Sequence, residues 1–333
     1  MAANVIGIDV SATALRITVC DKRGPVRFVE ARLPENMVRD NQIVSWDAMG
    51  DFLKETLKNE SIRVKDVCFA IPESAVYIQH VVLPSMSESQ LKVNLPYEFH
   101  DYINRDMDKY IYDYAVNHID AEKMDLLAVA VTRDLVERYT AMCHRAGLRL
   151  RILAPDVIAF RNLLRVYGDN RGNADDHKDC VILDLGDESA HLHFFSNGEF
   201  EVTRSLDTGC LALVEPIAAA TGIDPHLILM GQSGSLTEEA EQNNETFLDQ
   251  CNNLALSVMR VLNFYSYNNP NNSINALYVC GAGIRLKPLM NEIAANIELP
   301  LMLATELIPH GLELPEGLAI APQSYGICVG KEG

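Results

Sequence analysis

Two acidic residues in similar surroundings are the first candidates for chemistry. Asp9 lies in VIGIDVSATALRITV (5–19) and Asp184 lies in VILDLGDESAHLHFF (181–195). Each segment has the pattern of an apolar strand, an aspartate, a turn of small residues and a second strand. Backbone N–H groups at such turns can bind phosphate, and paired carboxylates can hold Mg²⁺ through water. The two segments together predict a site for phosphate and magnesium.

A third segment adds a different kind of contact. VCGAGIRLKPL (279–289) reads as a strand that ends in Gly281-Ala282-Gly283, with a helix after it. A turn of this kind lets a flat ring or a phosphate approach the backbone.

The elements that position these turns repeat along the chain. Short apolar runs predict strands over 4–10, 15–20 and 26–33, and the pattern returns at 180–186 and in the hairpin around Asn197-Gly198. The repetition predicts two similar α/β lobes with a cleft between them. The polar stretch 169–179 is the expected boundary between the halves.

The segment between the first strands and this boundary mixes both kinds of element. Ser45 precedes a helical pattern over 46–58, and a second helix begins at Ser87. Pro96 lies inside that second pattern, so we expect the helix to break there. Further strands are expected over 110–119 and 125–132.

Composition narrows the function classes. The 333 residues include 48% hydrophobic and 22% charged residues, which is typical of a globular chain, and the net charge is −18. This negative charge argues against a general nucleic-acid or anionic-membrane surface. The eight cysteines form no CxxC pair, so we expect reduced, buried thiols in a cytoplasmic protein.

In this order and spacing, the three turn segments resemble the phosphate-1 loop, phosphate-2 loop and adenosine motif of the actin-like ATPase superfamily. Within it the chain is similar to the PilM family of type IV pilus assembly proteins, relatives of FtsA. The likeness extends to VYIQHVVLPSMSESQLKVNLPYEFHDYI, to LLAVAVTRDLVERYTAMCHRAGLRLRILAPDVIAF and to VMRVLNFY.

The resemblance implies a fold and its subdivision. The fold is an α/β, actin-like (ribonuclease H-like) duplicated two-lobe architecture with an inserted α+β subdomain 1C. Subdomain 1A is expected over 1–33 plus 131–179, and 1C over 34–130. Subdomain 2A is expected over 180–208 plus 275–333, and 2B over 209–274.

The resemblance also implies a site for ATP and Mg²⁺. Its nucleotide-binding residues would be Asp9, Ser11, Ala12, Thr13, Arg16, Asp184, Gly186, Asp187, Ser189, Gly281, Ala282 and Gly283. Asp9 and Asp184 would hold Mg²⁺ through water. Asp156 is the candidate catalytic residue, because a carboxylate facing the cleft could orient water. It is also interpretable as a carboxylate that opposes a helix dipole, and both interpretations stay open.

Among the departures from the family pattern, three residues affect the phosphate site. Ser11 stands where a glycine is usual, and its β-carbon obstructs close approach of a phosphate. Asp187 and Glu188 place two carboxylates where a γ-phosphate would lie. Like charges about 4 Å apart repel by about 1 kcal/mol in water and about 4 kcal/mol at an effective dielectric of 20. We therefore expect weak or no hydrolysis; the alternative is an active ATPase whose nucleotide state gates partner binding.

The implied partner is a membrane protein. The resemblance predicts an adaptor of a type IV pilus, or a related competence or secretion, assembly platform. It would hold the cytoplasmic N-terminal tail of a PilN-like protein between 1A and 1C, and the partner would recruit it to the inner face of the cytoplasmic membrane. Self-association stays open. The aromatic residues over 97–114 are candidates for the core of 1C or for an apolar groove beside a sheet edge.

Overall fold

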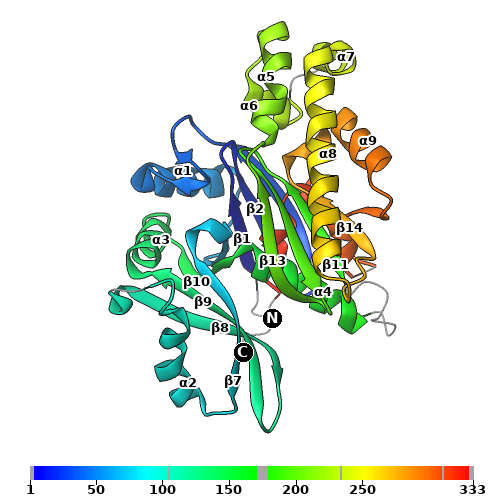
Figure 1. Cartoon of the computed structure of the whole chain (residues 1–333). Coiled ribbons are helices and arrows are strands. Elements are labelled where there is room, and N and C mark those ends of the chain that lie inside the picture. The colour runs from blue at the N-terminus through cyan, green and yellow to red at the C-terminus, as the bar shows by residue number, and fades with distance from the viewer. Residues whose placement is uncertain (1–3, 104–105, 171–178, 233–234, 310, 330–333) are drawn as a thin grey trace.

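The computed structural model describes residues 4–103, 106–170, 179–232, 235–309 and 311–329. Within these residues two five-stranded sheets stand side by side, one in each lobe (Figure 1). The first has the order β10-β6-β1-β2-β3 and the second β13-β12-β11-β14-β15. The strands of the first sheet are β1 (Val5–Val10), β2 (Ala14–Cys20), β3 (Pro25–Arg32), β6 (Asp66–Ile71) and β10 (Arg149–Pro155). Those of the second are β11 (Cys180–Leu185), β12 (Ala190–Ser196), β13 (Glu199–Leu206), β14 (Ala276–Cys280) and β15 (Leu301–Leu303).

The two sheets are built in the same way. In each, three consecutive strands form an antiparallel meander, and the first of them pairs in parallel with a later strand. Asp9 and Asp184 occupy the next-to-last positions of β1 and β11. The duplicated two-lobe α/β fold predicted from the repeated pattern is confirmed.

Helices cover the outer faces and fill the space between the lobes. Those packed on the first lobe are α1 (Trp46–Asn59), α3 (Arg133–Arg145), α4 (Asp156–Asn170) and α10 (Gln323–Gly326). Those of the second lobe are α5 (Cys210–Thr221), α6 (Pro225–Leu229), α7 (Ser235–Asn243), α8 (Glu245–Asn268) and α9 (Lys287–Asn296). Buried Val157, Phe160 and Leu163 of α4 pack in one cluster with Ile182 and Tyr278 of the second sheet. This shared apolar cluster joins the lobes at their base.

A third sheet is inserted into the first lobe. It has the order β7-β9-β8, from β7 (Tyr77–Pro84), β8 (Tyr110–Ile119) and β9 (Lys123–Thr132). Its own core includes Leu91, Leu95, Phe99 and Leu126. Ser87 begins α2 (Glu88–Asn94) with a capping box, in which its side chain accepts from the N–H of Gln90.

The helix break expected at Pro96 is confirmed. The α-helix ends at Asn94, and the chain continues as the 3-10 turn η2 (Leu95–Phe99). A proline cannot donate the hydrogen bond that would continue an α-helix. Short elements connect the main helices and strands of the described residues. In the first lobe they are β4 (Val38–Arg39), β5 (Gln42–Ile43), η1 (Glu73–Ala75) and η3 (Met107–Lys109). In the second lobe η4 (Ala282–Arg285), η5 (Ala304–Leu307) and η6 (Leu318–Ile320) play the same connecting role.

The sheet to which β6 belongs affects where the insertion expected over 34–130 begins. Strand β6 pairs in parallel with β1, and α1 packs on the same sheet, so both lie with the first lobe. A parallel pair needs a crossover connection, and α1 lies within the segment that provides it. The separate three-stranded sheet begins only at Tyr77.

The C-terminal helix α10 packs directly on the first strand. A β-carbon on Gly7 would lie 1.7 Å from the backbone oxygen of Ser324, so only glycine permits this contact. The hydroxyls of Thr18 and Ser324 lie 2.5 Å apart in the same buried layer. The last turn of the described chain thus completes one face of the first sheet.

Two further findings concern the expected boundary between the halves and membrane-spanning helices. Of the expected boundary loop 169–179, residues 171–178 lie outside the described residues. Among the residues that are described, no helix is both long and apolar enough to cross a membrane.

Candidate functional site

The tips of the two equivalent hairpins meet between the lobes, where the repeated pattern predicted a cleft, and this region is called the cleft below. The carboxylate of Asp187, in the β11–β12 turn, accepts two hydrogen bonds from Thr13 in the β1–β2 turn. The Thr13 backbone N–H donates at 2.9 Å and its hydroxyl at 2.7 Å, both to Oδ2. Both residues are buried, with exposed fractions of 1% for Thr13 and 2% for Asp187. Two of the predicted phosphate loops therefore bind each other.

A buried arginine organises the charges around this contact. Arg16 is directly opposite Asp9 in the hairpin register, and its guanidinium lies 3.3 Å from the Asp9 carboxylate. The same guanidinium lies 3.1 Å from Glu30 and 3.7 Å from Asp187. Burial alone would lower the pKa of Arg16, but the three carboxylates raise it instead. Arg16 is therefore a permanent cation at the centre of the cleft.

The same arrangement affects Asp187. Burial by itself would raise the pKa of its carboxyl, but Arg16 and the donors on Ser11 and Thr13 hold the pKa of Asp187 below its ordinary value. Asp187 is thus ionised at neutral pH.

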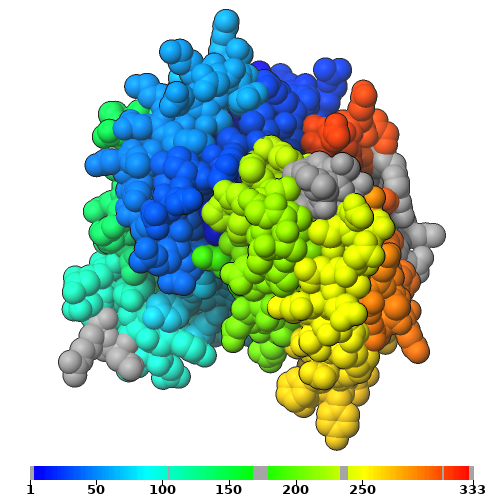
Figure 2. All heavy atoms as spheres, turned by 90° about the horizontal axis from the view of Figure 1, so that it is seen from above, coloured from blue at the N-terminus to red at the C-terminus, as the bar shows by residue number. Residues whose placement is uncertain are grey.

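Further polar contacts join the lobes along the cleft. Arg285 of η4 donates to Glu30 of β3 at 2.6 Å, and Arg32 forms an ion pair with Asp224 at the start of α6. The backbone N–H of Asn41 donates to Glu188 at 2.6 Å. Figure 2 shows the N-terminal segment, in blue, directly beside the yellow-green helices α5 and α6 on the face seen from above.

The small residues of the two turns are engaged locally. Ser11 closes its own turn, because its N–H donates to the oxygen of Ala14 and its hydroxyl accepts from the N–H of Ala14. Ala12, beside it, is half-buried. The Ser189 hydroxyl lies 2.8 Å from Nε2 of His191. The oxygen of Gly186 accepts from the N–H of Cys210, the first residue of α5.

The glycine turn after β14 packs against β11. Gly281 has φ +89°, and a β-carbon there would lie 2.4 Å from the oxygen of Leu185 and 2.5 Å from Oδ1 of Asp184. A β-carbon on Gly283 would lie 2.6 Å from Cβ of Leu185. Ala282 is 1% exposed. Close packing of the backbone on β11 accounts for both glycines.

Three further acids in and near the cleft have carboxyl groups whose pKa is raised above its ordinary value. Burial, with the nearby charge of Asp9, raises the pKa of Asp184 to about 7. Burial also raises the pKa of Asp9, against the opposing effect of Arg16. Burial and the charge of Glu73 raise the pKa of Asp156 well above its usual value.

Asp156 and the metal candidates can be placed from these contacts. Oδ1 of Asp156 accepts from the N–H of Val157 at 2.7 Å, at the start of α4. The candidate metal ligand Asp9 is in contact with the Arg16 guanidinium. Within the described part of the chain, no group of three or more histidine, cysteine or acidic side chains is arranged to hold a metal ion.

Sequence reasoning missed several residues of the cleft. Glu30, Arg285, Asn41 and Gln323 all contact its charged groups. Glu30 could have been found, because the β2–β3 register places it directly opposite Arg16. Arg285 follows Gly283 by two residues, within the glycine-turn segment 279–289. Nothing local marks Asn41 and Gln323, which reach the cleft from distant segments.

Comparison with known proteins gives the family. A family model described as type IV pilus assembly protein PilM matches residues 7–310. A solved PilM–PilN type IV pilus biogenesis complex contains a chain with TM-score 0.71 and 17% identity, covering 98% of this chain and 96% of that one.

Two other solved structures share the fold. The ethanolamine utilization protein EutJ from Carboxydothermus hydrogenoformans has TM-score 0.57 and 15% identity, covering 99% of this chain and 91% of that one. MreB5 of Spiroplasma citri bound to AMPPNP has TM-score 0.51 and 12% identity, covering 92% and 93%. These likenesses show the actin-like fold, and the family model covers most of the chain. The chain therefore belongs to the PilM family of type IV pilus assembly proteins.

Proposed function

We propose that this protein is an adaptor of a type IV pilus assembly platform that binds the cytoplasmic N-terminal tail of a PilN-like membrane protein. Membership of the PilM family supports the pilus role. The fold is shared with a chain of a PilM–PilN complex, which supports the choice of partner. On this proposal the partner brings the protein to the inner face of the cytoplasmic membrane.

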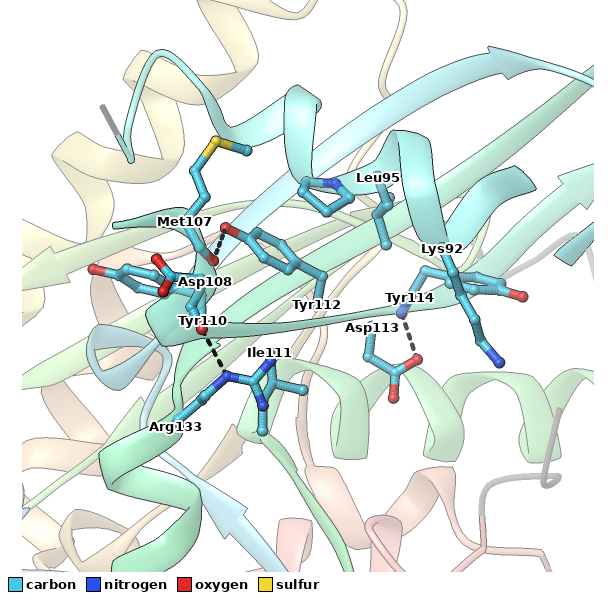
Figure 3. Close-up of a pocket in the computed structure, with 11 residues that line it drawn as sticks. Lys92, Leu95, Met107, Asp108, Tyr110, Ile111, Tyr112, Asp113, Tyr114 and Arg133 are labelled. Carbon is cyan, nitrogen blue, oxygen red and sulfur yellow. Dashed lines mark hydrogen bonds between the residues drawn. The ribbon is translucent and has the colours of Figure 1, made fainter. Parts of the chain in front are cut away.

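The observation that carries the proposal is a hollow of about 550 Å³ beside strand β8. Figure 3 shows its labelled residues, with Lys92 and Arg133 on opposite sides and Tyr112 between them. Its lining comes from α2, η2, η3, β8 and the first residue of α3: Lys92, Leu95, Pro96, Met107, Asp108, Tyr110, Ile111, Tyr112, Asp113, Tyr114 and Arg133. The lining residues belong to the inserted unit, apart from Arg133 at the start of α3, which supports a groove on the side of 1C that adjoins 1A.

The sheet edge beside the hollow is suited to an extended peptide. Strand β8 is at one end of the sheet order β7-β9-β8, so within the described residues one of its sides has no strand partner. At its far end, Arg161 and Arg165 of α4 both donate to the oxygen of Val116. The accessible edge is thus the stretch 110–115, enough for a peptide to add as a further strand.

The aromatic residues expected here divide between core and surface. Phe99 is fully buried, and Tyr112 packs against it with ring centroids 5.6 Å apart. Tyr110 and Tyr114 line the hollow, whereas Tyr97 and Tyr102 are exposed. Tyrosines with a covered ring edge and a solvent-facing hydroxyl are typical of peptide-binding surfaces.

We also propose a subdivision of the chain on the expected lines, with one change. The unit 1–33 plus 131–179 is extended by the segment from residue 34 to the one before Tyr77, and the units 180–208 plus 275–333 and 209–274 are kept. The membership of β6 in the first sheet supports moving the start of the inserted unit from residue 34 to the segment before Tyr77.

A peptide-binding experiment tests the proposal. The probe is a fluorescein-labelled synthetic peptide with the cytoplasmic N-terminal sequence of the PilN-like protein from the same genome. We expect saturable fluorescence anisotropy with the full chain, and at least tenfold weaker binding by Tyr114→Ala. Tyr267→Ala is the matched control, since Tyr267 is 85% exposed on α8, outside the hollow. Equal binding by both variants, or no binding by the wild-type chain, would contradict the proposal.

The mode of binding has its own test. An added strand pairs through alternate backbone amides. N-methylation of the peptide at every second residue should therefore abolish binding in one phase and leave it nearly unchanged in the other. Equal effects of both phases would exclude strand addition along β8.

A further inference from the structure

The actin-like fold raises the question of whether ATP and Mg²⁺ fit this cleft. A neighbour with the same fold, MreB5, has been solved with the ATP analogue AMPPNP. A phosphate in such a cleft needs anion-binding donors, namely backbone N–H groups, hydroxyls and cations. Here the Thr13 N–H, the Thr13 hydroxyl and the Arg16 guanidinium form a donor set of this kind.

These donors already hold an anion that belongs to the chain. Both donors of Thr13 are directed at Oδ2 of Asp187, and Arg16 lies 3.7 Å from its Oδ1. The carboxylate is 2% exposed, so it is enclosed by these partners rather than merely near them. We propose that the Asp187 carboxylate takes the place of a nucleotide phosphate, so that the chain closes its own cleft without ATP or Mg²⁺.

The start of helix α5 holds the loop that carries Asp187 in place. The first amides of α5 donate to it: Cys210 N–H to the oxygen of Gly186, and Leu211 N–H to that of Asp187. A β-carbon on Gly209 would lie 2.2 Å from the carbonyl carbon of Glu188, so loop and helix are in direct backbone contact. The N-terminal N–H groups of α5, which are natural phosphate donors, thus serve the loop instead.

The position expected for Mg²⁺ is likewise occupied by a group of the chain itself. The guanidinium of Arg16 lies on Asp9, where a hydrated cation would bind. Its positive charge also offsets Glu30 and Asp187. A second cation, Arg285, reaches Glu30 from the other lobe. Two arginines therefore supply in this cleft the positive charge that Mg²⁺ would otherwise bring.

This inference does not rest on the partner proposed above, because no cleft residue named here lines the hollow beside β8. It describes what holds the lobes together. On this proposal the two lobes of this chain are already joined when the protein folds, without a bound nucleotide. Its binding to a partner therefore does not depend on nucleotide.

Anion rescue tests the proposal. The melting temperature of the full chain, of Asp187→Ala and of the control Asp207→Ala is followed as inorganic phosphate rises to about 20 mM, with NaCl at equal ionic strength as reference. Removing one member of a buried charged pair should lower the melting temperature of Asp187→Ala by about 5 °C or more. Phosphate should restore part of that loss by binding Thr13 and Arg16. The wild-type chain and Asp207→Ala, which lacks only an exposed acid, should respond to phosphate no more than to NaCl.

Outcomes of two kinds, one for the Asp187→Ala variant and one for the wild type, would overturn the proposal. One is a melting temperature of Asp187→Ala equal to that of the wild type, or a phosphate effect no larger than that of NaCl. The other is an increase in the wild-type melting temperature with submillimolar Mg-ATP, accompanied by saturable binding heat.

A second variant keeps the test decisive if Asp187→Ala does not fold. Asp187→Asn fills the same volume without the charge, so it should melt below the wild type and show no phosphate rescue. An unchanged melting temperature of Asp187→Asn would also overturn the proposal. The Mg-ATP titration of the wild type needs no variant.

Discussion

The cleft and the edge of β8 differ in how far their polar and aromatic side chains are buried. In the cleft, Arg16, Thr13 and Asp187 are almost completely buried, and each is paired within the chain. Beside β8, Tyr97 and Tyr102 are 64% and 61% exposed, and a hollow runs along a strand that has no outer strand partner among the described residues. The charged groups of the cleft are engaged mainly with one another, although Nη2 of Arg16 and Oδ1 of Asp187, 3.7 Å apart, have no hydrogen-bond partner in the part of the chain that the structure describes. Tyr97 and Tyr102 of the inserted unit instead face solvent.

The difference shows that a binding site is recognised by what its groups still lack. Carboxylates, an arginine and glycine turns mark the cleft in the sequence, yet their hydrogen bonds and close contacts are internal. The β8 region has no such motif, but its edge amides and aromatic rings are available. The following changes test this contrast, from the largest expected effect to the smallest.

Removing the charge of Asp184 should stabilise the protein at high pH. The folded-state pKa of about 7 lies above the ordinary value of 3.8. The contribution of Asp184 to stability is therefore fully present below pH about 4 and is lost as the pH rises to about 7. Asp184→Asn should raise the free energy of unfolding by up to about 4 kcal/mol at pH 8 and have little effect at pH 4. Urea denaturation at both pH values measures this, and an equal effect at both would show that the charge is not strained.

Placing a β-carbon in the glycine turn after β14 should lower the stability of the protein even when no nucleotide is present. Gly281→Ala combines a positive φ of +89° with a contact of 2.4 Å to the oxygen of Leu185. We expect a loss of about 3 kcal/mol or more in nucleotide-free buffer. Gly222→Ala is the matched control, because it has φ +71° and no atom within 4 Å of the new carbon, and it should lose about 1 kcal/mol. Equal losses by denaturation would show that packing on β11 does not require this glycine.

Acid should weaken the contact across the cleft. The pKa of Asp187 is lowered in the folded state, so its contribution is present above the ordinary value of 3.8 and is lost as the pH falls through the lower folded-state value. The difference in unfolding free energy between the wild type and Asp187→Asn should be about 2 kcal/mol at pH 7 and should shrink below pH 4. A difference that does not depend on pH would separate the role of Asp187 from its charge.

Reversing one charge at the rim of the hollow should have the smallest effect. Lys92 is exposed and pairs with Glu88 at 2.6 Å. Lys92→Glu should change the affinity for the partner peptide by about threefold, with a larger difference at low salt. Lys54→Glu on α1, away from the hollow, is the control in the same anisotropy titration. No change at any ionic strength would place the peptide elsewhere than beside Lys92.

Much of the fold could be predicted because its signals are local. The alternation of apolar runs and turns gave the meanders, and the capping box at Ser87 and the break at Pro96 follow from the chemistry of single residues. The equivalence of Asp9 and Asp184 was visible as a repeated pattern and is confirmed by their places on β1 and β11.

The cleft contacts could be predicted only in part. The sequence showed that Asp187 and Glu188 depart from the family pattern, but their partners Thr13 and Asn41 lie more than 140 residues away. The later start proposed for the inserted unit could not be read from the sequence, because a buried strand such as β6 has the same apolar pattern whichever sheet it joins. Long-range pairing depends on packing that no single segment encodes.

The packing of α10 on β1 has a consequence for folding during biosynthesis. The first sheet presents Gly7 and Thr18 to Ser324, more than 300 residues later in the chain. A ribosome adds about 5–20 residues per second, so one face of the first lobe stays uncovered for roughly 15–60 s after its first strands emerge. The N-terminal lobe, although translated first, is completed last.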